Sequence, residues 1–137
     1  MTLGRKQELF YRMNNEFDRW LLGHEGLEIR GGELYRPGEQ AFLNSITCRV
    51  CQELEDQHDT LNHKFKPVGI ANSNHCRKLA SDKNIFIEGR WIRDSEELRW
   101  AGVEWKRRST DQVTCCWGGD FSNPDGNHFS FEHEGVR

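Results

Sequence analysis

Two histidines of this sequence lie in surroundings that suit metal chemistry. His75 stands seven residues before Asp82, among small or polar neighbours. His128 follows Asp125 by three residues, in a stretch rich in glycine, asparagine and aspartate. A hydrolytic zinc site needs three protein ligands and an open position for water, whose pKa the ion lowers toward about 7. A second carboxylate near that water is needed as general base and then acid, so these four residues are the types that the chemistry requires.

Spacing by itself leaves other roles open for these residues. A histidine and an aspartate seven positions apart occur in many proteins, and a lone histidine is more often structural or exposed than a ligand. The zinc site is therefore one hypothesis, and a structural role is the other.

Four motifs of the sequence resemble, in order, those of one family. The segment 73–82, Ser-Asn-His-Cys-Arg-Lys-Leu-Ala-Ser-Asp, resembles a first zinc motif that runs Ser-x-His, several variable residues including an alanine, and then an aspartate. Segment 125–128, Asp-Gly-Asn-His, resembles the second motif, Asp-x-x-His. Trp-Gly-Gly at 117–119 resembles the stretch that precedes it in phage-type members, and Tyr35-Arg36 with Gln40 resembles an upstream Tyr-Arg…Gln element. The family comprises zinc D,D-carboxypeptidases, D-Ala-D-Ala dipeptidases and phage L-alanyl-D-glutamate endopeptidases, and the similarity runs from about residue 27 onward.

The resemblance implies a role for each matching residue. His75, Asp82 and His128 would bind zinc, and Asp125 would transfer the proton. Arg36 would lie over the site and stabilise an oxyanion or hold a substrate carboxylate, tasks that suit a permanently charged guanidinium. Without the resemblance, a surface arginine after a strand is the simpler interpretation of Arg36.

The function that the resemblance implies is that of a zinc metallopeptidase acting on the peptide stem of bacterial peptidoglycan. The bond that fits best is L-Ala–D-Glu, as in phage endolysins, which lyse the host cell, and D,D-carboxypeptidase activity is the nearest alternative. A metal-dependent nuclease is an alternative of another class, because histidine, asparagine and aspartate gather near the end of the sequence. An inactive wall-binding module that stacks sugars on Trp91, Trp100, Trp105 and Trp117 is a third.

Two features depart from the family pattern. Many members have glycine three residues after the first histidine, where this chain has Lys78. Lysine there indicates a backbone that does not demand glycine, although a positive φ stays open. The loop between Cys51 and Gly69 is longer than expected and is predicted to alter the substrate groove.

Periodicity predicts helices and strands that would carry these residues. We expect a single α+β domain over residues 1–137, a small antiparallel sheet flanked by helices, as the family's hedgehog/D,D-peptidase fold implies. Zinc would lie where the strand after His75 meets the strand carrying His128. The expected elements are a helix at 7–22 ended by Gly23, a strand pair within 26–36, a helix at 39–55, a long loop at 56–74, a strand at 79–87, a turn at 88–89, a strand at 90–92, a helix beginning near 94–95, turns at 117–119 and 123–126, and a strand at 128–131.

Charge and cysteine content limit the partners and the compartment. The net charge of −3 gives no general case for nucleic acid. No apolar run reaches the length of a membrane span, and residues 1–12 lack the apolar core of a signal peptide. The missing signal fits a phage enzyme that would stay in the host cytoplasm until it is released and would then act on the wall. We also expect the protein to be a monomer. Five cysteines argue for reduced thiols, while Cys48-x-x-Cys51 followed by His58 and His63 leaves a structural zinc finger conceivable.

Overall fold

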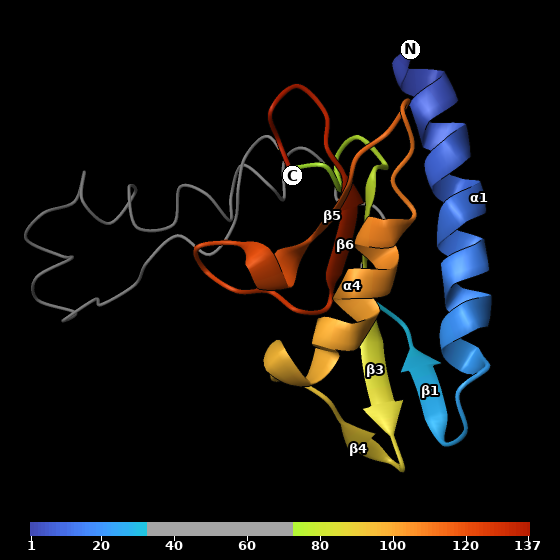
Figure 1. The fold of residues 1–137 in the computed structure, drawn as a ribbon, viewed down its shortest axis with the longest axis vertical. Coiled ribbons are helices and arrows are strands. Elements are labelled where there is room, and N and C mark those ends of the chain that lie inside the picture. Colours follow the sequence, from blue (N-terminus) through green and yellow to red (C-terminus); the bar gives the residue numbers. More distant parts are fainter. Residues whose placement is uncertain (33–72) are drawn as a thin grey trace, which may run out of the picture.

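The computed structural model describes residues 1–32 and 73–137. These residues form an α+β fold in which two α-helices accompany two small antiparallel sheets (Figure 1). The predicted fold class is confirmed, although the strands divide into two sheets where one was expected. Arg36, the helix expected at 39–55 and most of the loop expected at 56–74 lie outside the described residues.

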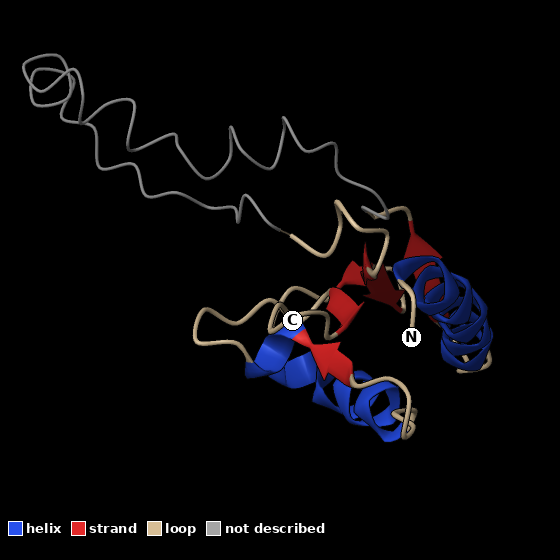
Figure 2. Cartoon of the chain, turned by 90° about the horizontal axis from the view of Figure 1, so that it is seen from above, coloured by secondary structure: helices blue, strands red, loops and turns tan. Residues whose placement is uncertain are grey.

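Helix α1 (Leu3–Leu22) begins four residues before the predicted helix and ends where predicted. Thr2 caps its start, because its hydroxyl accepts a hydrogen bond from the backbone N–H of Arg5 at 3.3 Å. Gly23 caps its end. Its inward face carries buried residues at helical spacing, namely Phe10, Asn14, Phe17 and Leu21. Figure 2 looks along this helix and shows the strands gathered beside it.

The first sheet has the order β1-β3-β4 and consists of β1 (Leu27–Arg30), β3 (Asn84–Ile87) and β4 (Arg90–Trp91). Residues Glu88 and Gly89 join β3 to β4 with φ of 49° and 74°, the left-handed pair that a tight two-residue hairpin needs. That predicted turn is confirmed. The partner of β1 is β3, a pairing that the sequence did not indicate. The second half of the strand pair expected within 26–36 lies outside the described residues, so that expectation stays a prediction.

The second sheet has the order β2-β6-β5 and consists of β2 (Ala80–Asp82), β6 (His128–Phe131) and β5 (Cys115–Trp117). The central strand β6 is the closing strand predicted from the sequence, and all four of its residues are buried. In the register of β2 and β6, Asp82 lies opposite His128. The sheet therefore brings the two motifs together.

The single strand predicted at 79–87 is wrong, because the chain leaves one sheet and enters the other at Lys83. The Lys83 side chain is buried, and its Nζ lies 2.6 Å from Oδ1 of Asp18 and 2.7 Å from Oδ1 of Asn14 on α1. Its backbone N–H donates to the carbonyl of Asn127 at 2.9 Å. These contacts bind the Lys83 ammonium group to α1 and hold the backbone at the point where it passes from one sheet to the other.

Aromatic side chains fill the core between α1, the second sheet and helix α4 (Arg99–Arg107). Trp105 of α4 is fully buried, and its ring lies within about 6 Å of four phenylalanine rings, those of Phe10, Phe17, Phe129 and Phe131. The 3-10 helix η1 (Glu96–Leu98) leads into α4, and a carboxylate oxygen of Asp94 accepts from the N–H of Glu96. Within the described residues, no helix combines the length and apolar character needed to cross a membrane.

Candidate metal centre

Three of the predicted site residues meet at one point. His75 lies in the turn before β2, Asp82 ends β2, and His128 begins β6. The Nε2 atom of His75 lies 3.2 Å from Oδ1 of Asp82 and 3.2 Å from Nδ1 of His128, and that Nδ1 lies 3.1 Å from the same Oδ1. One ligand atom from each residue therefore forms a nearly equilateral triangle.

The triangle fits a tetrahedral metal ion. Metal bonds of about 2.0–2.1 Å, usual for zinc with nitrogen and oxygen ligands, give tetrahedral edges of about 3.3–3.4 Å, close to the three separations observed. Three lone-pair acceptors facing one another repel unless a cation or a proton lies among them. Both imidazoles are buried, with 2% and 7% exposure for His75 and His128, while the Asp82 side chain is 20% exposed. The described residues thus include a His-Asp-His group able to hold a metal.

The charge state of Asp82 suits a ligand. Burial raises the pKa of the Asp82 carboxyl, but the imidazole rings of His128 and His75 beside it outweigh that effect and hold the pKa well below its usual range. The carboxylate is therefore ionised at neutral pH, as metal binding requires.

The turn that carries His75 is a Schellman motif. The N–H of Leu79 donates to the carbonyl of Asn74 at 2.9 Å, and the N–H of Lys78 donates to the carbonyl of His75 at 3.2 Å. In this motif the residue at the position of Lys78 is left-handed and is usually glycine, and the φ of Lys78 is +58°. The positive φ that the sequence left open at this position is therefore present, and lysine adopts it without glycine.

The Trp-Gly-Gly segment builds the turn that leads to His128. The 3-10 helix η2 (Gly118–Asp120) follows β5, and the carbonyl of Gly118 accepts from the N–H of Asp125 at 2.9 Å. A Cβ atom at Gly118 would lie 2.1 Å from the carbonyl oxygen of Asp125 and 2.8 Å from Cβ of His128, so only glycine permits this approach. The Trp117 ring is buried and donates from Nε1 to the carbonyl of Gly126 at 2.8 Å.

Asp125 shares the turn with His128, whose N–H donates to the Asp125 carbonyl at 3.1 Å. Asp125 is exposed, and its part in proton transfer stays a prediction. The role of Arg36 and the effect of the Cys51–Gly69 loop fall outside the described residues.

Comparison with known proteins adds one likeness of fold. The sequence matches no protein-family model and no curated protein. A solved structure of the L-Ala D-Glu endopeptidase ChiX of Serratia marcescens is similar at 15% identity and a TM-score of 0.47, over 90% of this chain and 77% of that one. At this level of likeness the endopeptidase activity belongs to that protein, and the activity of this chain has to be argued from its own side chains.

The burial of the tryptophans weighs against sugar stacking by the set proposed from the sequence. Trp105 and Trp117 are fully buried in the core, whereas Trp91 is 45% exposed. The vicinal cysteines, Cys115 and Cys116, are buried free thiols and Cys76 is a partly buried one. Cys48 and Cys51 lie outside the described residues, as does any zinc finger they would form.

Two buried polar residues near the metal centre were not singled out from the sequence. Asn74 has 1% exposure and Lys83 has 3%. Asn74 occupies a variable position of the first motif, so its spacing carries no signal. For Lys83 the available signal is the run of polar residues at 81–84 in the middle of the predicted strand 79–87, which indicates a break in the strand.

Proposed function

We propose that this protein is a zinc metallopeptidase that hydrolyses an amide bond in the peptide stem of bacterial peptidoglycan. The observation that carries the proposal is the triangle of His75, Asp82 and His128, whose donor set of two imidazoles and one carboxylate suits a catalytic zinc site. The order of the four sequence motifs supports the choice of substrate class, with L-Ala–D-Glu as the bond favoured.

Each residue has a distinct task in the proposed reaction. When bound, zinc would supply a Lewis acid that polarises the scissile carbonyl and lowers the pKa of a bound water. His75 and His128 would each hold the ion through a ring nitrogen, and Asp82 would hold it through an oxygen of its ionised carboxylate. Asp125 takes a proton from the attacking water and returns it to the leaving amine. Arg36 stabilises the negative charge that develops on the carbonyl oxygen, a role that rests on the motif resemblance alone.

The setting proposed for this activity is that of a phage endolysin. The protein would act as a monomer, remain in the host cytoplasm until the membrane is opened, and then reach the wall.

Digestion of purified peptidoglycan tests the function. We expect new amino termini to appear, and mass spectrometry of the fragments names the bond that is cut. Asp125→Ala should retain the metal and lose about 10²–10⁴-fold in rate, the usual contribution of a general base, whereas His128→Ala should lose both metal and activity. Digestion of nucleic acid in place of peptidoglycan, abolished by His128→Ala, would overturn the peptidase assignment. Near-normal turnover by Asp125→Ala would overturn the role given to that residue.

A further inference from the structure

The three metal-ligand candidates are not held equally by the sheet. Asp82 and His128 are cross-strand partners in β2 and β6, so the strand ladder fixes their separation. His75 lies before β2, in the Schellman turn, and has no ladder partner. Its position therefore depends on contacts that tie the turn to the rest of the fold.

Asn74 provides such a tie from the residue next to His75. The two N–H groups of its side-chain amide reach two backbone carbonyls: Nδ2 lies 2.9 Å from the oxygen of Phe131 and 2.9 Å from the oxygen of Val136. Phe131 ends β6, the strand that begins with His128. Asn74 thus connects the turn of one ligand to the strand of another, and it does so with a side chain that is 1% exposed.

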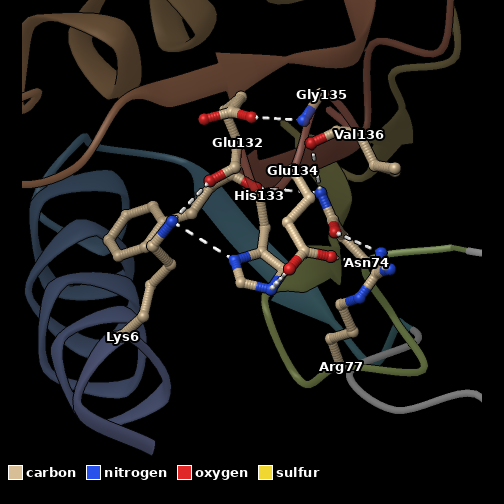
Figure 3. A network of polar contacts seen from close by, with 9 residues as sticks. Lys6, Asn74, Arg77, Glu132, His133, Glu134, Gly135 and Val136 are labelled. Carbon is tan, nitrogen blue, oxygen red and sulfur yellow. Dashed lines mark hydrogen bonds and ion pairs between the residues drawn. The ribbon is translucent and has the colours of Figure 1, made fainter. Parts of the chain in front are cut away.

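The second acceptor belongs to a small hairpin at residues 133–136, which we call the tail hairpin (Figure 3). His133 and Val136 form its backbone bridge, and Glu134 and Gly135 form its turn with φ of 52° and 79°. The Gly135 N–H donates to Oε1 of Glu132 at 2.6 Å, which closes the turn.

Helix α1 holds both the tail hairpin and the turn of His75. Lys6 Nζ donates to the Glu132 carbonyl at 3.0 Å and lies 3.3 Å from Nδ1 of His133. Gln7 donates from Nε2 to the carbonyl of Arg77 at 2.8 Å. Arg77 also lies 3.9 Å from a carboxylate oxygen of Glu134 (Figure 3). The hairpin is therefore anchored independently of the metal centre and can serve as a fixed support for Asn74.

We propose that Asn74 and the tail hairpin form a positioning element that sets His75 at bonding distance from the metal. This role rests on the proposed metal centre. Asn74 does not touch the ion; it fixes the backbone from which the His75 ring extends. The geometry makes the affinity for zinc depend on a turn at Gly135, which is 60 residues beyond His75 in the sequence.

Two glycines give a matched test of this dependence. Gly135 and Gly89 each follow a left-handed glutamate in a two-residue turn, have φ of 79° and 74°, and have open space where a Cβ would be added. Valine at either position strains the turn alone, because a β-branched residue disfavours positive φ. Only the turn at Gly135 belongs to the hairpin that supports Asn74, whereas the turn at Gly89 belongs to the sheet β1-β3-β4, which carries none of the three candidate ligands.

The measurement is the zinc affinity of the full chain, by competition with a chromophoric chelator. We expect Gly135→Val to weaken binding about tenfold, the lower end of the range for residues that orient metal ligands, and Gly89→Val to change it less than about twofold. The Co²⁺ absorption spectrum of Gly135→Val should also shift, because an altered His75 position changes the ligand field while a general loss of stability does not. Equal affinities for wild type and Gly135→Val, or equal losses at both glycines, would overturn the positioning role.

Asn74→Ala tests the same contact from its other end, with Leu98→Ala as a destabilised control in η1. Weaker zinc binding by Asn74→Ala alone supports the role, and unchanged binding contradicts it. If Asn74→Ala does not fold, the glycine pair still decides the question. A wild-type chain that binds no zinc would instead overturn the metal centre itself, so the two failures are distinguishable.

Discussion

Replacement of Lys78 by glycine should stabilise the turn that carries His75. Lys78 is exposed and has a φ of +58°, a conformation that costs a residue with a Cβ atom about 1–2 kcal/mol. Glycine avoids that cost but loses about 0.5–1 kcal/mol more chain entropy on folding. The difference leaves Lys78→Gly more stable than Lys78→Ala by roughly 0.5–1 kcal/mol, or about 2–5 °C in Tm for a chain of this size.

Urea denaturation of the two variants and the wild type in the presence of a chelator measures this difference without a contribution from metal. Lys78→Ala is the control, because it removes the lysine side chain and keeps the left-handed strain. If Lys78→Gly is no more stable than Lys78→Ala, the Schellman assignment of this turn is wrong.

Three further predictions concern parts of the fold that support the site. Asp18→Asn leaves the buried ammonium group of Lys83 without its carboxylate partner. It should lower the free energy of unfolding by roughly 1–3 kcal/mol after allowance for the partial exposure of Asp18. Lys83→Met added to Asp18→Asn should restore most of the lost free energy in urea titrations, and no recovery would contradict the pairing. Gly102→Ala places a Cβ 2.1 Å from the Trp117 ring and should cost about 1–3 kcal/mol by overpacking, so an unchanged Tm would refute that contact. Burial raises the pKa of the Cys115 thiol to about 12. The contribution of the neutral, buried thiol to stability is therefore complete below the unfolded thiol pKa of about 8.5 and is lost as pH rises toward 12. Mass spectrometry should show that iodoacetamide at pH 8 modifies Cys115 about a hundredfold or more slowly in the folded state than in urea, and equal rates would contradict its burial.

Local patterns predicted the elements that depend on nearby residues. The helix that ends at Gly23 and the turn at Glu88 and Gly89 follow from apolar spacing and turn chemistry, and both are present. The closing strand 128–131 was also predicted. The break at Lys83 was not, because it depends on Asp18 and Asn14, which lie more than 60 residues earlier in the sequence. Strand partners were missed for the same reason, since the partner of β1 lies beyond residue 80.

The candidate site was predictable as a set of residue types, and its geometry was not. The motifs indicated His75, Asp82 and His128, and the structure brings these three together. Nothing in the spacing indicated that Asn74 would bond to Phe131 and Val136, because that contact joins segments that are distant in the sequence. The left-handed backbone of Lys78 was left open and was not predicted, since lysine is an unusual residue for that conformation.

Zinc binding by equilibrium dialysis tests the central claim most directly. The wild-type chain should bind about one zinc, as expected of a single three-ligand site. His75→Ala, Asp82→Ala and His128→Ala should each lose most of that binding, while Asp125→Ala should retain it. Zinc bound equally by wild type and by the Asp82→Ala and His128→Ala variants, or not bound by the wild type, would contradict the account.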